Sequence, residues 1–186
     1  MPNAVSKAKS RELEVISSRY VTPHMLRVTL GGAGLQGFPE AQESAYVKLL
    51  FDQGENQRPL MRTYTIRHQR DNEIDIDFVV HRHPGPAGSW ALQAEPGQRI
   101  RIGGPGARKL INPQGDWFLL LGDMTSLPAI SVNLCLLPED ARGHAVIEIP
   151  SESDRQQLQC PPNMQLHWVV NADQNAPGEM LLNALH

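Results

Sequence analysis

Cysteine is scarce in this chain of 186 residues, which contains only Cys135 and Cys160. Small secreted domains held by disulfides need several pairs, and zinc or iron–sulfur sites need closely spaced ligands that are missing here. The scarcity therefore argues against a disulfide scaffold and a cysteine metal centre. It agrees with a protein of the reducing cytoplasm.

Long apolar runs and a surplus of positive charge are missing too. No segment approaches the roughly 18 apolar residues of a membrane-spanning helix, and the basic N-terminus has no apolar run behind it. The formal net charge is −3, and lysine and arginine are scattered singly, unlike the basic surface of a nucleic-acid binder. We expect a cytoplasmic protein with small-molecule partners that binds neither nucleic acid nor membranes.

The chain does contain enough apolar residues, 40% of the total, to bury a core. Up to about residue 114 it consists of short β-rich runs separated by turn residues, a spacing typical of a β-barrel or sandwich. The runs expected to form strands are 12–21, 24–30, 45–51, 62–68, 73–81 and 98–104. One helix is expected among them, over 85–94.

The run EIDIDFVV alternates almost strictly, with apolar residues on one face and Asp75 and Asp77 on the other. Alternation of this kind predicts a half-buried strand. The turn Asp71-Asn72 joins this strand to the preceding one as a hairpin. That pairing places residues 62–65 near His81.

From about Gly115 the pattern changes to alternating strands and helices, which indicates a parallel α/β sheet. The run WFLLLGD is continuously apolar, as is typical of a strand buried on both faces. Strands are expected over 117–123, 143–150 and 164–170. Helices are expected over 127–137, over the polar stretch 151–159, and from 177 onward.

The turn-forming residues Asn112-Pro113-Gln114-Gly115 mark the natural boundary between these two patterns. The sequence thus predicts an antiparallel β-barrel domain over residues 1–114 and a parallel α/β domain over 115–186. The second domain offers about three strands, where doubly wound nucleotide-binding domains have about five or six. It ends at His186 within an expected helix, so we expect a partial domain that lacks a unit or two of roughly 30 residues at its C-terminus.

Three patterns resemble known motifs without their context. GGAGLQG, residues 31–37, contains G-x-G-x-x-G but is followed by another strand instead of a helix, so a loop is favoured. GGPGARK, residues 103–109, lacks the ending of a P-loop and is expected to be a turn closing the barrel. His81 and His83 lack nearby cysteine or carboxylate partners, so no metal site is expected.

Three other stretches suit a nucleotide-like ligand. The first is MRTYTIRHQ, where Arg62, Tyr64 and Thr65 bring a guanidinium, an aromatic ring and a hydroxyl to one strand. Such groups can bind the phosphate, stack on the ring and bond the polar edge of a planar heterocycle. Taken alone, the same cluster would more often be plain barrel surface.

The second stretch, HRHPGPAGSWA, leads a Gly/Pro turn into a short helix, whose free N–H groups favour an anion. Its small residues would let a pyrophosphate approach the backbone, while Ser89 could add a hydroxyl and Trp90 a wall. These small residues are Gly85, Ala87 and Gly88.

The third stretch, GDMTSLPAI, follows the first strand of the α/β part. Asp123 and Thr125 occupy the position beyond the carboxyl end of a strand, where open sheets bind ligands. Either residue could equally cap the following helix, so both interpretations stay open.

In this order the three stretches, R-x-Y-T, H-x-x-x-G-P-A-x-x-W-A and G-D-x-T-x-x-P-A, resemble the siderophore-interacting protein family of ferric-siderophore reductases. That family is a branch of the ferredoxin-reductase-like flavoenzymes. The resemblance implies a barrel that holds FAD, with His81 near the isoalloxazine edge and Asp123 and Thr125 facing the flavin across the domain cleft. It places Arg62, Tyr64 and Thr65 at the flavin and its phosphates, and Ala87, Ser89, Trp90 and Ala91 around the pyrophosphate.

The implied reaction is electron transfer from NADPH or NADH, or from a reduced ferredoxin-type donor, through FAD to iron(III) in a siderophore. Outer-sphere transfer needs no acid or base, so no catalytic residue is expected. Two alternatives stay open. One is a flavin or ferredoxin-type NAD(P)H oxidoreductase with another acceptor, and the other is a truncated, non-catalytic module that binds flavin or ferric siderophore.

Overall fold

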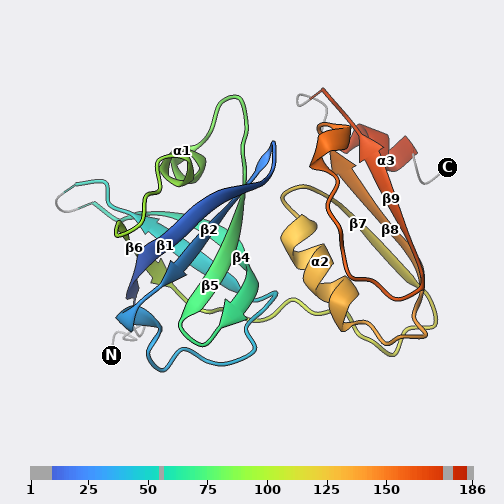
Figure 1. The fold of residues 1–186 in the computed structure, drawn as a ribbon, viewed down its shortest axis with the longest axis horizontal. Helices are drawn as coiled ribbons and strands as arrows, with labels where there is room; N and C mark the ends of the chain where they lie inside the picture. The colour runs from blue at the N-terminus through green and yellow to red at the C-terminus, as the bar shows by residue number, and fades with distance from the viewer. Residues whose placement is uncertain (1–9, 55–56, 174–177, 184–186) are drawn as a thin grey trace, which may run out of the picture.

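The computed structural model describes residues 10–54, 57–173 and 178–183. A β-barrel and a smaller unit built on a three-stranded sheet lie side by side, joined by the segment between strands β6 and β7 (Figure 1). Both predicted architectures are therefore confirmed. The precise division at residues 114 and 115 stays a prediction.

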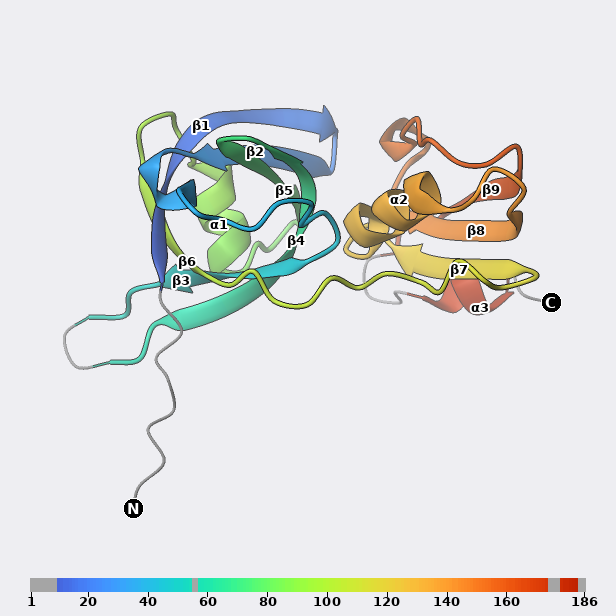
Figure 2. The ribbon, with the colours of Figure 1, turned by 90° about the horizontal axis from the view of Figure 1, so that it is seen from below.

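The barrel consists of six antiparallel strands in the closed order β1-β2-β5-β4-β3-β6. They match the six expected runs and are β1 (Arg11–Thr22), β2 (Met25–Gly31), β3 (Tyr46–Phe51), β4 (Leu60–Arg70), β5 (Glu73–Val79) and β6 (Arg99–Gly103). Helix α1 (Pro86–Leu92) covers one end of the barrel, where Ala87 and Ala91 join the core (Figure 2).

The β4–β5 hairpin forms as expected, with Arg70 opposite Glu73 across the Asp71-Asn72 turn. The expectation of a half-buried β5 is wrong on its polar face, because Asp75 and Asp77 are only 4% and 6% exposed. Basic and polar side chains from the neighbouring strands β2 and β4 cover and pair with them. The alternating pattern therefore predicted the strand correctly, but it did not predict that neighbouring strands cover the two aspartates.

The glycine-rich stretch 31–37 is a loop containing a single 3₁₀ turn, η1 (Ala33–Leu35), as predicted. Gly34 lies so close to β1 that an added Cβ would meet the Glu12 carbonyl oxygen at 1.9 Å. The Arg11 guanidinium donates to the Gly34 carbonyl oxygen at 2.9 Å. Close packing against β1, not nucleotide binding, therefore explains this glycine.

The second unit has the parallel strand order β7-β8-β9. Its elements are β7 (Phe118–Asp123), α2 (Leu127–Leu136), β8 (Arg142–Ile149), η2 (Glu152–Asp154), β9 (Asn163–Val170) and α3 (Glu179–Asn183). Helix α2 packs on one face of the sheet and also lies against β4 of the barrel. None of the described helices is both long and apolar enough to span a bilayer.

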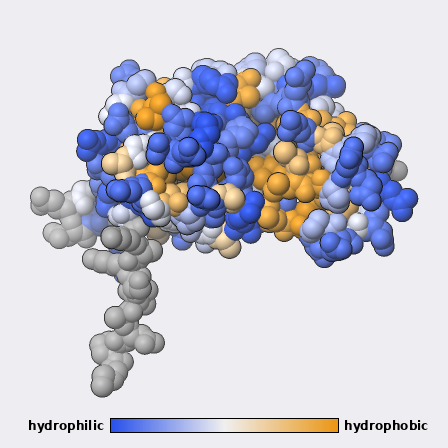
Figure 3. Space-filling model, turned by 60° about the horizontal axis from the view of Figure 1, so that its bottom comes forward, coloured by the Kyte–Doolittle hydropathy of each residue, from blue (hydrophilic) through white to orange (hydrophobic). Residues whose placement is uncertain are grey.

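Two expectations for this unit are wrong. β7 is not buried on both faces, because it is an edge strand among those described and its Leu119 and Leu121 are exposed. Figure 3 shows a broad apolar area on this part of the molecule. The polar stretch 151–159 forms only the turn η2 and then an extended segment, because it has no apolar face to bury as a helix and Pro161 follows closely. The last expected helix is present as α3, and its predicted end lies outside the described residues.

Candidate functional site

A cavity of about 270 Å³ lies between the barrel, α1 and the N-terminus of α2. Strand β4, the loop before α1 and the first turn of α2 contribute its walls. Most of the predicted site residues meet there, namely Arg62, Tyr64, Thr65, His81, Gly85, Ala87, Gly88 and Thr125. The hairpin pairing inferred from the sequence is what brings them together, because β4 and β5 run side by side.

The β4 wall combines an aromatic ring with a cation. Tyr64 is half-buried and packs on Phe78 with ring centroids 4.4 Å apart. Burial raises the pKa of the Tyr64 hydroxyl, so this group stays neutral at ordinary pH. Arg62 is exposed, and among the described residues its guanidinium donates one hydrogen bond, to the carbonyl oxygen of its neighbour Met61 at 3.0 Å. It can therefore turn to an anion at little cost.

One carboxylate also lines this cavity, but its charge is matched. Asp77 accepts two hydrogen bonds from Arg27, at 2.6 and 2.8 Å. Although burial alone would lower it, the hydrogen bond and the charge of Asp77 raise the pKa of Arg27, so the pair is ionised. The cavity wall therefore presents little net negative charge to a phosphate.

The glycine turn before α1 is open toward the cavity. An added Cβ on Gly85 would meet no described atom within 4 Å, while one on Gly88 would lie 3.1 Å from the Pro84 Cβ. Ser89 uses its hydroxyl internally, donating to the Pro84 carbonyl oxygen at 3.3 Å, and does not line the cavity. The turn thus offers space and backbone N–H groups instead of side chains.

Trp90 and Ala91, like Ser89, do not line this cavity. Trp90 packs between Phe51 and Phe78, with centroids 6.2 and 5.8 Å away, and faces a separate hollow beside β3 and β6. Ala91 is buried in the barrel core. Both residues support the barrel end from beneath, so any effect they have on the cavity is indirect.

Asp123 binds the turn that leads into α2. Its Oδ1 accepts hydrogen bonds from Thr125 N at 2.9 Å, Thr125 Oγ1 at 2.6 Å and Ser126 N at 3.1 Å. The N-cap residue of α2 is Ser126, so Asp123 does not cap the helix itself, and Thr125 lines the cavity. By fixing the turn before α2, this carboxylate holds that wall in place.

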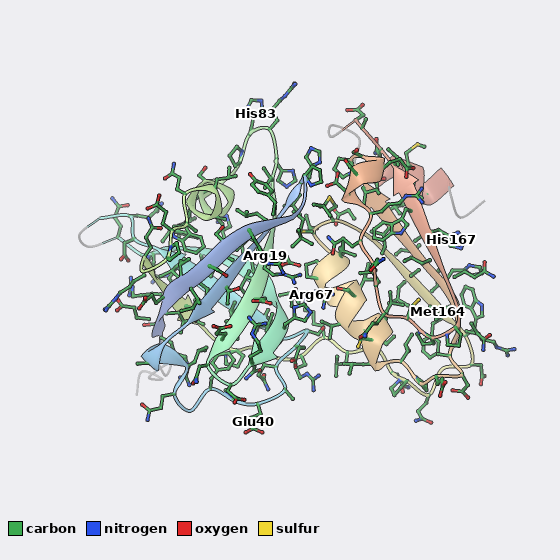
Figure 4. The ribbon with its side chains drawn as sticks, in the orientation of Figure 1. Arg19, Glu40, Arg67, His83, Met164 and His167 are labelled. Carbon is green, nitrogen blue, oxygen red and sulfur yellow. The ribbon has the colours of Figure 1, made fainter. Side chains whose placement is uncertain are left out.

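A second cavity of about 90 Å³ adjoins the first at the carboxyl ends of β7 and β8. The two share the wall residues Val79, His81 and Thr125. His83, by contrast, is exposed at the tip of the loop before α1 (Figure 4). Within the described residues, no group of three or more His, Cys, Asp or Glu side chains could hold a metal ion.

Glu148 lines the second cavity and was missed by sequence reasoning. It is only 6% exposed; Oε1 accepts from Gly178 N at 3.0 Å, and Oε2 has no partner among the described residues. The sequence did contain a pointer to it. Glu148 is the acidic residue at the carboxyl end of the expected strand 143–150, and parallel sheets bind ligands at the edge formed by these strand ends. An unpaired buried carboxylate oxygen needs a hydrogen-bond donor from beyond the described residues, such as water or a ligand.

The arrangement fits a flavin dinucleotide in the first cavity. It offers a ring on which to stack, a guanidinium free to bind phosphate, and a glycine turn with unfilled space. The second cavity, with Asp123 and Glu148 in its wall, suits the hydroxyl and amide donors of a second ligand. The shared wall would bring the two ligands close together.

Comparison with known proteins agrees with this geometry. Residues 14–57 and 52–109 match the family model described as the siderophore-interacting FAD-binding domain, and residues 115–186 match the siderophore-interacting protein model. The chain is 34% identical to ferric vibriobactin reductase ViuB of Vibrio cholerae over 204 aligned positions, which cover all of this chain and 75% of that protein.

Solved structures give the same result. The siderophore-interacting protein SipS from Aeromonas hydrophila superposes with a TM-score of 0.81 at 33% identity, covering 96% of this chain and 73% of that one. A siderophore utilization protein from T. fusca gives 0.82 at 34% identity, covering 95% and 75%. A ferredoxin-NADP+ reductase from Plasmodium falciparum, at a TM-score of 0.64 and 13% identity over 89% of this chain and 75% of that one, shares the fold alone.

Proposed function

This chain belongs to the siderophore-interacting protein family, and from that premise we propose that it is an FAD-dependent reductase acting on ferric siderophores. The observation that carries the proposal is the pair of adjoining cavities between barrel and sheet. One suits a flavin dinucleotide and the other suits its electron donor, NADH or NADPH. Their common wall of Val79, His81 and Thr125 would keep donor and flavin adjacent.

The proposed role of the protein is to bind FAD and to orient it. Tyr64 would stack on the flavin, Arg62 would neutralise phosphate, and the Gly85 turn would admit the pyrophosphate to the backbone. When bound, FAD supplies the redox chemistry that links a two-electron donor to a one-electron acceptor. Asp123 would fix the turn that carries Thr125, and it would also line the cavity of the electron donor.

In the overall reaction, one NAD(P)H would give up two electrons and release one proton, and two ferric chelates would each gain one electron. Iron(II) binds the hard oxygen ligands of siderophores more weakly than iron(III) does, so reduction would release the metal. A reduced ferredoxin-type protein would serve as an alternative donor of single electrons.

The test is to purify the full chain with FAD and mix it anaerobically with NADH or NADPH, and then with a ferric catecholate siderophore. We expect a yellow protein whose flavin absorbance bleaches with the nucleotide and recovers when the ferric chelate is added. Tyr64→Ala should weaken FAD binding by about tenfold, because an aromatic contact contributes about 0.5–1.5 kcal/mol beyond its buried area. Tyr64→Phe keeps the ring and serves as the matched control.

The outcomes separate the alternatives. A protein that takes up no FAD contradicts the proposal at its base. Flavin that NAD(P)H and reduced ferredoxin both leave oxidised would indicate the binding module. Reduced flavin that passes electrons to free flavin or ferredoxin, but not to ferric siderophore, would indicate an oxidoreductase with another acceptor.

A further inference from the structure

A third space, a cleft between the barrel and the α/β unit, takes no part in the proposed reaction. It has a volume of about 1050 Å³ and is lined by the β1–β2 turn, the loop before β3, β4, α2 and the segment 155–159. Figure 4 shows Arg67 of β4 between the barrel and α2, on this side of the molecule. The cleft is thus built from both parts, like the flavin cavity, but from different residues.

A buried ion pair separates the cleft from the flavin cavity. Arg27 lines the cleft, Asp77 lines the flavin cavity, and the two are joined by hydrogen bonds of 2.6 and 2.8 Å. Among the described residues, none lines both spaces. A ligand in the cleft would therefore touch the far side of the wall that faces the flavin.

The cleft carries an excess of positive charge. Of its four arginines, Arg27 and Arg155 are paired with Asp77 and Glu152. In the described part of the chain, Arg67 and Arg108 form no ion pair; Arg67 contacts the His68 ring at 3.0 Å, and Arg108 donates to the Glu43 backbone oxygen at 3.0 Å.

Glu43 contributes the one carboxylate among the described residues that line the cleft, so its charge cannot balance both free guanidinium groups. Burial lowers the pKa of the Arg67 guanidinium, the charge of Asp77 offsets only part of this lowering, and the charge of Arg27 lowers the pKa further. Arg67 is therefore a cation that the surrounding protein does not fully compensate. An anion in the cleft would supply the missing partner.

Polar groups beneath the cleft are also unsatisfied. The Thr22 hydroxyl, on a residue 9% exposed, and the Gln156 amide nitrogen are buried with no partner among the described residues. Buried polar atoms are rarely left without a hydrogen bond in native proteins. Apolar side chains of Val21, Val132 and Leu136 line the same space, so an occupant with a carbon skeleton fits better than a bare inorganic ion.

We propose that this cleft binds a small organic anion carrying carboxylate or phosphate groups, held chiefly by Arg67 and Arg108 and separate from the flavin cavity. The volume is ample, because small-molecule pockets commonly enclose about 300–1,000 Å³. Both parts of the molecule contribute walls, so an occupant would also tie α2 to the barrel.

Cys135 provides a local probe, because its thiol lines the cleft and donates to the Gln159 side-chain oxygen at 3.3 Å. The experiment uses the full chain, loaded with FAD, in a Cys160→Ala background that leaves this single thiol. The rate of Cys135 alkylation by iodoacetamide, an uncharged reagent, is measured with sodium citrate, sodium pyrophosphate, or sodium chloride at matched ionic strength. At about ten times its dissociation constant, a bound anion should slow alkylation about tenfold, because only the free fraction reacts.

The variants decide what causes the protection. Arg67→Gln with Arg108→Gln should abolish it, while Arg99→Gln, an exposed arginine on β6 paired with Glu12, should leave it intact. Should the double variant fail to fold, Arg108→Gln alone, a change at an exposed residue, should weaken the protection measurably.

Protection by citrate alone would support a carboxylate ligand, and protection by pyrophosphate alone would support a phosphate ligand. Protection by both anions would support a site that accepts either group. No protection by either anion, or protection that survives the loss of Arg108 undiminished, would overturn the proposal. The assay does not depend on electron transfer, so it can succeed even if the proposed reductase activity is absent.

Discussion

Asp75 shows how much a single side chain depends on residues distant in sequence. It accepts hydrogen bonds from Thr29 at 2.8 Å, from His68 at 3.2 Å and from Arg70 at 2.8 and 3.0 Å. Burial alone would raise the pKa of Asp75, but the hydrogen bonds from His68, Arg70 and Thr29 outweigh it and hold the pKa well below its usual value. The ionised carboxylate is therefore part of what fixes β5 between β2 and β4.

The pH dependence of stability follows from that depressed pKa. The contribution of Asp75 is full above the unfolded-state pKa of about 3.9 and is lost as pH falls from there toward the lower pKa of the folded state. Asp75→Asn should lower the free energy of unfolding by about 2 kcal/mol at pH 7, as hydrogen bonds to charged groups suggest. Thermal unfolding from pH 7 to pH 3 should show the two proteins converging below about pH 4. A gap that stays constant to pH 3, or that Asp140→Asn reproduces at an exposed site, would contradict this role.

Glu148 is the residue expected to set the preference for the nucleotide donor, if the proposed function holds. An acidic side chain at the carboxyl end of the second strand accepts the ribose hydroxyls of NADH, whereas it repels the 2′-phosphate of NADPH. We expect the bound FAD to be reduced faster by NADH. Glu148→Gln should shift the ratio of the two kcat/KM values toward NADPH by about tenfold, which corresponds to about 1.4 kcal/mol. Stopped-flow bleaching of the flavin measures this ratio, and an unchanged ratio, or an equal change in the exposed control Glu139→Gln, would rule the idea out.

At the scale of elements, the turn before α1 can be tested without disturbing the barrel. Gly85 has an ordinary extended backbone, with φ −71° and ψ 179°, and a side chain there would enter the cavity instead of the protein. Gly85→Val should therefore change the stability of the FAD-free protein by less than about 0.5 kcal/mol. Crowding the cavity should cost FAD binding about 1–3 kcal/mol, or roughly fivefold to 150-fold in Kd. Fluorescence titration should rank glycine, alanine and valine in order of falling affinity; equal affinities would place the flavin elsewhere.

The elements that could be predicted are those whose pattern is local. Alternation and turn residues identify every strand of the barrel, and one hairpin turn suffices to bring Arg62, Tyr64 and His81 to one cavity. The expected surroundings of β5 and β7 failed for the opposite reason. Whether Asp77 is covered depends on Arg27 of another strand, and whether Leu119 is exposed depends on the order of strands in the sheet.

The candidate site shows the same limit. The sequence indicates that Trp90 follows a glycine turn, but not that its ring packs on Phe51 and Phe78. Glu148 could have been noticed at a strand end, yet its unpaired oxygen is visible only once its neighbours are placed. Side-chain direction and burial are decided by tertiary contacts, which a single sequence does not display.

At the scale of the whole molecule, the proposed chemistry requires the barrel and the sheet to stay docked, because the two cavities lie in the seam between them. One contact stands out there. Asp154 of η2 is fully buried and accepts hydrogen bonds from the His24 backbone N–H at 2.9 Å and from its ring Nδ1 at 2.7 Å. It ties the segment after β8 to the β1–β2 turn of the barrel. Asn133 of α2 adds a second tie through Lys109 and Ile111 of the connecting segment.

Removing the Asp154 contact should weaken the docking of the barrel on the α/β unit more than it destabilises either of them. Asp154→Ala leaves the partly buried donors of His24 without their acceptor, at a cost of about 3 kcal/mol. Hydrogen exchange should accelerate around residues 22–24 and 151–156, while the barrel strands β2 and β5 keep their protection. Asp140→Ala, at an exposed turn, is the matched control. Because β4 and α2 both line the flavin cavity, saturating FAD should restore part of the lost protection by binding the docked form. If FAD leaves the accelerated exchange unchanged, the flavin site does not span the contact between the barrel and the α/β unit.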